Sequence, residues 1–201
     1  MLALGIDPGT RCLGWGLVRK QGSRLFHVGH GVIQVDSRLS LAERLLCIDQ
    51  QLEELLSLHS PDVGSVETLF FHKDAQAAAK LGHARGVVLL RLARQGVSVA
   101  EYAPARVKRT VAGTGQADKR QMVLMVRAVL GLPELPRTDA ADALALAITH
   151  LRIEPLLRRL SRPAGGLDRV RLEALIRSRS QKKSTGRARQ ILSWGKRPKT
   201  G

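Results

Sequence analysis

The sequence predicts an α/β fold in which a mixed β-sheet is flanked by helices and followed by a basic C-terminal extension. Three observations predict it. Short apolar runs rich in β-branched residues come first, helical and strand-like patterns then alternate, and positive charge is concentrated in residues 151–201. The chain has 201 residues, of which 44% are hydrophobic, so it can bury a substantial core. This composition excludes a disordered or fibrous protein.

The first three elements are predicted strands joined by short turns. Leu2–Asp7 is an apolar run that ends at Pro8-Gly9, and two further runs of small and β-branched residues follow at 14–19 and 25–35. Because short turns join antiparallel neighbours, these runs predict an antiparallel meander.

Helices and two more strands follow the meander. Apolar residues recur at helical spacing from residue 39 to the Ser60-Pro61 boundary, and Asp118 is placed to cap a later helix. The sequence predicts a helix over 39–60, a strand over 62–67, a helix over 75–94, a strand over 97–102, and helices over 105–112, 118–130 and 138–151.

Two pairs of residues in the predicted meander have more than one interpretation. His27 and His30 are three positions apart in a strand, which predicts opposite faces and structural roles rather than a shared metal. Gly14 and Gly16 lie on one face of their strand. They could admit the backbone of a ligand, although packing within the hairpin explains them equally well.

The charge of the chain indicates a polyanionic partner. Lys and Arg total 33 against 17 Asp and Glu, which gives a net charge of +16. Residues 1–150 carry only +4 of this excess and residues 151–201 carry +12. We therefore predict a folded domain over 1–155 and a basic, largely disordered tail over 156–201, with nucleic acid as the leading partner. A solvated solubility tail, or a helix over 167–177 that binds anionic lipid, is the alternative.

The sequence favours a cytoplasmic protein. It contains no apolar stretch long enough to span a membrane, and Asp7 comes too early for the apolar region of a signal peptide. Cys12 and Cys47 form no paired motif, so we expect both to be reduced and structural.

Four carboxylates fall at positions typical of a catalytic site. Asp7 and Glu67 end two predicted strands, and Asp139 and Asp142 are three residues apart on a helix that is apolar on most sides. Ordinary alternatives exist, since Asp7 begins an Asp-Pro-Gly turn, Glu67 could cap a loop, and Thr138 could cap the helix.

Crowded carboxylates with little access to water are costly unless protons or cations neutralise them. Hard divalent cations prefer oxygen ligands, and four acids from three elements suit two Mg²⁺ ions, with Mn²⁺ as a substitute. Such a pair can activate water and stabilise the leaving oxygen of a displacement at phosphorus. The sequence therefore predicts metal-dependent phosphodiester chemistry.

The segments GIDPGTRCLGWGLV, VETLFF and TDAADALALAITH resemble the RuvC family of Holliday junction resolvases. The resemblance continues through HKDAQAAAKLGHARG, VKRTVAGTG and MVRAVLGL, and it covers residues 2–152. It implies an RNase H-like fold with a five-stranded mixed sheet. It also implies a homodimer that nicks two opposed strands of a four-way DNA junction during recombination and repair, in partnership with a RuvA–RuvB branch-migration complex.

The resemblance assigns Asp7, Glu67, Asp139 and Asp142 as the catalytic and metal-binding acids. It matches Phe70 to an aromatic that probes the junction, and Lys108 and Lys119 to lysines near the site. We also expect DNA contact at Arg120, because Lys119 and Arg120 occupy the first turn of a helix, where a phosphate would offset the unfavourable dipole. An exposed, solvated face is the alternative for Arg120, core packing is favoured for Phe71, and His72 could contact phosphate. The backbone that Gly14 and Gly16 could admit would then be that of DNA.

Other functions fit the sequence less well. The segment GIDPGT also resembles the first phosphate motif of actin-like ATPases and sugar kinases, which need a second such domain and further motifs. A non-catalytic junction-binding module would not need four acids. A nuclease of the same fold acting on another nucleic acid, such as an RNA/DNA hybrid, would share the chemistry and differ only in substrate.

Overall fold

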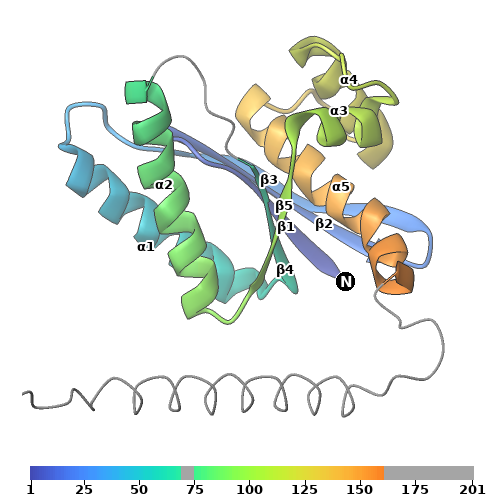
Figure 1. Cartoon of the computed structure of the whole chain (residues 1–201), viewed down its shortest axis with the longest axis horizontal. Helices are drawn as coiled ribbons and strands as arrows, with labels where there is room; N and C mark the ends of the chain where they lie inside the picture. Colours follow the sequence, from blue (N-terminus) through green and yellow to red (C-terminus); the bar gives the residue numbers. More distant parts are fainter. Residues whose placement is uncertain (69–74, 161–201) are drawn as a thin grey trace, which may run out of the picture. The chain divides into compact units, whose positions relative to one another are not determined.

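A five-stranded mixed sheet lies at the centre of the protein, with the strand order β3-β2-β1-β4-β5 (Figure 1). The structure is a computed structural model that describes residues 1–68 and 75–160. The strands are β1 (Leu2–Asp7), β2 (Cys12–Gln21), β3 (Arg24–Gln34), β4 (Val63–Glu67) and β5 (Ser98–Tyr102). The first three are antiparallel, whereas β4 runs parallel to β1 and β5 parallel to β4. The predicted meander and mixed sheet are confirmed.

Helices cover both faces of this sheet (Figure 1). They are α1 (Leu41–His59), α2 (Ala75–Arg94), α3 (Pro104–Ala112), α4 (Lys119–Leu130) and α5 (Thr138–Leu160). One buried cluster joins the sheet to α1 and α2, and a second joins it to α3, α4 and α5. Both faces of the central strands are therefore buried, which explains their nearly continuous apolar sequences.

Local sequence signals fix the ends of two helices. The Ser40 side chain accepts a hydrogen bond from the Glu43 backbone, and the Glu43 carboxylate accepts one from the Ser40 backbone, which forms a capping box. Asp118 and Gln121 form the same arrangement at α4, as the predicted cap requires.

The last described helix begins at residue 138, as the sequence predicts, but extends beyond its predicted end. It begins at Thr138 itself, because the Ala141 backbone N–H donates to the carbonyl of Arg137, one residue before the expected cap. It runs to Leu160 across Pro155, rather than ending near residue 151. The apolar stripe ends near Leu151, but the backbone continues as a helix.

Helix α5 packs against the sheet at unusually close range. A Cβ atom at Gly14 would lie 2.0 Å from the carbonyl oxygen of Asp139, and one at Gly16 would lie 2.7 Å from the side chain of Leu144. The space above both glycines is therefore filled by α5. The suggestion that Gly14 and Gly16 admit a DNA backbone is wrong.

The expectation that His27 and His30 point to opposite faces is also wrong. Their ring nitrogens lie 2.7 Å apart. The pairing of β2 with β3 shifts between Leu17 and Val18, so that Leu17 faces Gly29 while Val18 faces His27, and the intervening Val28 is an extra residue in the strand. Such a bulge changes the alternation by one position and brings residues three apart onto the same face.

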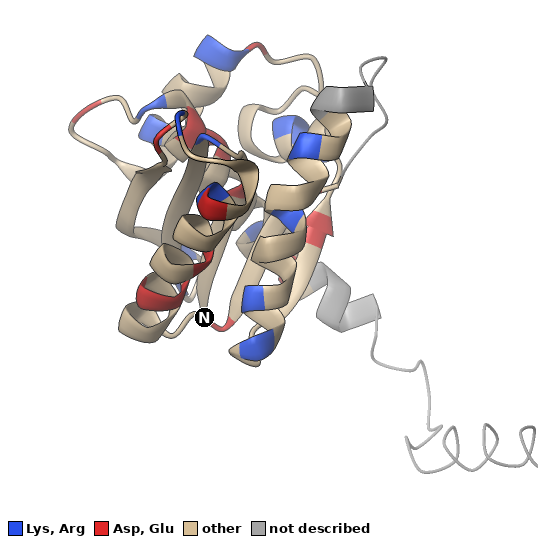
Figure 2. Cartoon of the chain, turned by 90° about the vertical axis from the view of Figure 1, so that its left-hand side faces the viewer, with Lys and Arg blue, Asp and Glu red and all other residues tan. Residues whose placement is uncertain are grey.

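Helices α1 and α2 are joined by charge as well as by apolar contact. Figure 2 shows acidic residues along α1 beside basic residues along α2. The buried Arg91 guanidinium of α2 pairs with both Asp49 and Glu53 of α1.

In the part of the chain that the structure describes, no helix is both long enough and apolar enough to cross a membrane.

Candidate active site

The carboxyl ends of β1 and β4 bring the first two acids together. These strands are parallel neighbours in which Ile6 pairs with Val66, so the next residues, Asp7 and Glu67, end the two strands side by side. The carboxyl ends of neighbouring parallel strands are the usual position of reactive groups in α/β folds.

The first turns of α5 bring the other two acids to the same edge. Gly14 pairs with Asp7 across β1 and β2, and the Asp139 carbonyl lies almost in contact with Gly14. Asp142 follows one helical turn later, so both acids face the end of β1. The predicted four carboxylates therefore meet at one end of the sheet.

The charges of these carboxylates act strongly on one another. The pKa of Asp7 is raised to about 7, first by burial and then by the negative charges of Asp142, Glu67 and Asp139, while Lys119 opposes the increase. Burial also raises the pKa of Asp142; Lys119 and Lys108 oppose this increase, and Asp139 adds to it. A site with these properties favours a proton or a cation.

A cavity of about 310 Å³ lies over this edge of the sheet. Its lining includes Asp7, Glu67 and Asp142 together with Lys108 and Lys119. Apolar side chains of α3, α4 and α5 complete the wall: Val107, Met122 and Leu146. Asp139 interacts electrostatically with Asp7 but lies beside the cavity, and Arg120 lies on the exposed surface outside it.

Two helix starts position the lysines. Pro104 is the first residue of α3 and presets its backbone, which places Lys108 one turn along. The capping box of Asp118 and Gln121 makes Lys119 the first residue of α4. Lysines at these positions offer cationic groups to a phosphate held near the carboxylates.

The end of β4 is held by residues that the sequence did not single out. The Arg85 Nε of α2 donates to the Glu67 carbonyl at 3.4 Å, and its guanidinium also pairs with Glu101 of β5. The Thr68 backbone N–H donates to the Tyr102 carbonyl at 3.0 Å. These bonds fix the backbone of Glu67, yet Arg85 looks like any other exposed helical arginine in the sequence.

A buried hydroxyl joins β4 to α5 just below the acids. Ser65 is fully buried, and its Oγ donates to the Leu146 carbonyl at 3.0 Å. A lone serine within the apolar strand VGSVE was the one sequence signal for this contact. The bond helps to hold Asp142, one turn before Leu146, against the sheet.

The donor set suits divalent cations that prefer oxygen ligands. Carboxylates from β1, β4 and α5 supply only oxygen, and the raised pKa of Asp7 shows that the site gains from added positive charge. Within residues 1–68 and 75–160, no three His, Cys, Asp or Glu side chains already stand in an arrangement that would hold a metal ion. The fit therefore rests on donor chemistry and charge.

Phe70, Phe71 and His72 lie outside the described residues.

Comparison with known proteins gives a consistent result. The family model for crossover junction endodeoxyribonuclease RuvC matches residues 3–150. The RuvC of Sorangium cellulosum is 60% identical over 151 residues, which cover 75% of this chain and 84% of that protein. The RuvC of Rhodopseudomonas palustris is 52% identical over 147 residues, covering 73% and 84%.

Solved structures agree with these relatives. Thermus thermophilus RuvC in complex with a Holliday junction substrate has a TM-score of 0.73 and 37% identity, and the match covers 78% of this chain and 96% of that one. The yeast mitochondrial Holliday junction resolvase Ydc2, at 15% identity and a TM-score of 0.56, shares the fold. The expected RNase H-like architecture is confirmed, and the chain belongs to the RuvC family of crossover junction endodeoxyribonucleases.

Proposed function

We propose that this protein is a Holliday junction resolvase, a metal-dependent endonuclease that nicks opposed strands of a four-way DNA junction. Membership of the RuvC family supports the proposal, as does the likeness to a relative whose structure contains a Holliday junction. The observation that carries it is the meeting of Asp7, Glu67 and Asp142 with two lysines in one cavity.

The four acids would hold the metal ions. Asp7 and Glu67 would supply ligands from the ends of two strands, and Asp139 and Asp142 would supply ligands from α5. When bound, two divalent cations, for which we propose Mg²⁺, supply an activated water and stabilisation of the leaving oxygen. Hydrolysis at this site would leave a 5′-phosphate and a 3′-hydroxyl.

The remaining residues orient the DNA. Lys108 and Lys119 face the carboxylates, so they are placed to bind the scissile phosphate and to offset its charge. Arg85 and Ser65 hold the backbone that carries the acids. We assign Phe70 to stacking at the junction, where one base on an aromatic ring contributes about 1–3 kcal/mol, and Arg120 to a backbone phosphate.

A homodimer would supply one site for each opposed strand. We infer that the dimer acts in the cytoplasm with a RuvA–RuvB branch-migration complex. The domain boundary after residue 155 and the DNA-binding role of the tail beyond it belong to the same proposal, and residues 161–201 lie outside the described part of the chain.

The site assignment is tested by replacing carboxylates one at a time. Asp7→Asn and Glu67→Gln should abolish junction cleavage in Mg²⁺ while junction binding in chelator is preserved. Glu54→Gln, on the exposed face of α1, is the matched control and should cleave like the wild type. Undiminished cleavage by Asp7→Asn would show that the carboxylates at this edge are not the catalytic groups.

A further inference from the structure

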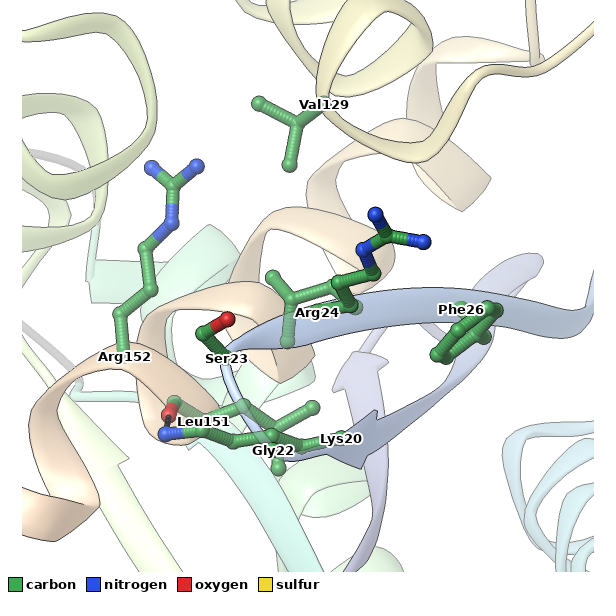
Figure 3. A pocket seen from close by; sticks show the side chains of 9 residues that line it. Lys20, Gly22, Ser23, Arg24, Phe26, Val129, Leu151 and Arg152 are labelled. Atoms are coloured by element: carbon green, nitrogen blue, oxygen red, sulfur yellow. Dashed lines mark hydrogen bonds between the residues drawn. The ribbon is translucent and has the colours of Figure 1, made fainter.

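A second and larger hollow lies at the opposite end of the sheet from the carboxylates. Its volume is about 680 Å³, and it is bounded by the β2–β3 turn, the end of α4 and the middle of α5 (Figure 3). The direction of β2 sets the separation, because Gly14 pairs with Asp7 at the catalytic edge whereas Arg19 pairs with Leu2 at the other.

The hollow is positively charged. Lys20, Arg24 and Arg152 line it, and no carboxylate belongs to the described lining. Two of these cations are fixed by the fold: the Lys20 Nζ donates to the Leu151 carbonyl at 2.6 Å, and the Arg152 guanidinium donates to the Thr110 carbonyl at 2.7 Å. Arg24 is exposed, and its side chain has no hydrogen bond or salt bridge with any other described residue.

The donors in this hollow suit phosphate oxygens. In Figure 3, Ser23 lies between the side chains of Arg24 and Arg152, with Val129 across the hollow. Planar guanidinium groups bind phosphate with paired hydrogen bonds, and a serine hydroxyl can donate a third. A stable protein partner would instead need a broad, well-packed apolar patch, whereas this hollow is small and open.

The hollow lies within reach of DNA bound at the carboxylates. Helix α5 carries Asp142 at one end of this path and Leu151 at the other, a rise of about 14 Å at 1.5 Å per residue. Helix α4 connects the same two places, since Lys119 lines the catalytic cavity and Val129 lines the hollow. About 14 Å corresponds to about four base-pair steps of duplex.

We propose that this hollow is a second DNA-contact site, in which Arg24, Arg152 and Ser23 hold a backbone phosphate of a junction arm about four base pairs from the nick. The proposal rests on the proposed function for the identity of the DNA. It differs from that function in needing neither the carboxylates nor a metal ion. The site contributes to junction binding and to the path of the DNA arm.

Arg24→Gln is the decisive variant, because it removes the one lining cation whose side chain makes no hydrogen bond or salt bridge in the described fold. The matched control is Arg94→Gln, another exposed arginine, in the last turn of α2 on the other face of the sheet. Binding is measured in chelator on a junction with full-length arms and on junctions with one neutral methylphosphonate at successive positions along the arms. Circular dichroism checks that both variants fold.

We expect Arg24→Gln to bind the full junction several-fold more weakly than Arg94→Gln. Its salt dependence should be flatter by about 0.9 in log K per log salt, the effect of neutralising one phosphate fewer. A methylphosphonate near the expected position should weaken binding by the wild type and leave binding by Arg24→Gln unchanged. In Mg²⁺ the variant should show a raised KM and an unchanged kcat.

Equal binding by the two variants at every salt concentration would overturn the proposal. The proposal would also be overturned if Arg24→Gln bound every methylphosphonate junction more weakly than the wild type by the same factor. The charge of Arg24 would then act generally and not at a defined phosphate. If Arg24→Gln bound DNA normally but lost affinity for an acidic peptide, the hollow would serve a protein partner instead. Failure of the wild type to cut any junction would reject the resolvase assignment. The DNA-contact site would still be supported if a methylphosphonate at one position weakened binding by the wild type but not by Arg24→Gln.

Discussion

Gly5 of β1 lies directly against Ala143 of α5, so closely that a Cβ atom at Gly5 would stand 1.8 Å from the Ala143 carbonyl oxygen. Asp142 precedes Ala143, and Asp7 lies two residues beyond Gly5. The close approach of a glycine to a helix backbone therefore determines how near the acids of two elements come. The packing of α5 against β1 therefore also sets the geometry of the site.

Gly5→Ala should destabilise the protein, because α5 has to move away from the sheet. Overpacking of this kind costs about 1–3 kcal/mol of unfolding free energy, which denaturant titration would measure. Gly86→Ala on α2 is the control. A Cβ there meets nothing within 4 Å, and a mid-helix alanine should stabilise by about 0.5–1 kcal/mol. Equal stability of Gly5→Ala and the wild type would contradict the close packing.

Asp7 should make the metal-free protein less stable as the pH rises. The pKa of Asp7 is about 7 in the folded protein and near 4 when unfolded, so between these values the folded state binds more protons. The unfolding free energy therefore falls from about pH 4 to about pH 7. Asp7→Asn removes the ionisation, and in chelator it should be more stable than the wild type at pH 8, with little difference near pH 4. If the unfolding free energies of the wild type and Asp7→Asn changed with pH in parallel, the raised pKa of Asp7 would be refuted.

Lys119→Gln should move the acid limb of the cleavage profile to higher pH. The positive charge of Lys119 lowers the pKa of both Asp7 and Asp142, so its removal leaves these carboxyls protonated to a higher pH. We expect several-fold slower cleavage at pH 6 and a smaller loss at pH 8. Arg120→Gln is the neighbouring control, since Arg120 lies outside the cavity and its replacement should weaken binding without moving the limb. The same shift in both variants would exclude a specific effect of Lys119.

Deletion of residues 161–201 should flatten the salt dependence of DNA binding. The segment removed carries most of the net positive charge of the chain, and each phosphate of duplex DNA that is no longer neutralised reduces the slope by about 0.9. The preference for junctions over linear duplex should remain, because the acids and lysines of the cavity remain. An unchanged slope would mean that the tail does not bind DNA.

Much of the fold and the carboxylate site was predictable from the sequence because both depend on local signals. Asp118 as a helix cap, the strand ending at Asp7 and the spacing of Asp139 and Asp142 follow from patterns within a few residues. The parallel alignment of β1 with β4 then brings Asp7 and Glu67 together without any further signal.

The remaining features depend on contacts that are distant in sequence. The bulge that brings His27 beside His30 arises from the pairing of β2 with β3, and the sequence of β3 alone carries no pattern that predicts it. The hydrogen bond from Arg85 to the Glu67 carbonyl depends on how α2 packs on β4 and β5. The hollow around Arg24 likewise exists only because the β2–β3 turn meets α4 and α5 in the fold.

Strand-resolved cleavage of a synthetic four-way junction tests the central claim most directly. The purified protein would be compared on this junction, a linear duplex and an RNA/DNA hybrid, each with Mg²⁺ and with chelator. We predict paired nicks in opposed strands of the junction alone, present with Mg²⁺, absent with chelator and absent for Asp7→Asn. Tight junction binding without any cutting, or preferential cutting of the hybrid, would contradict the assignment.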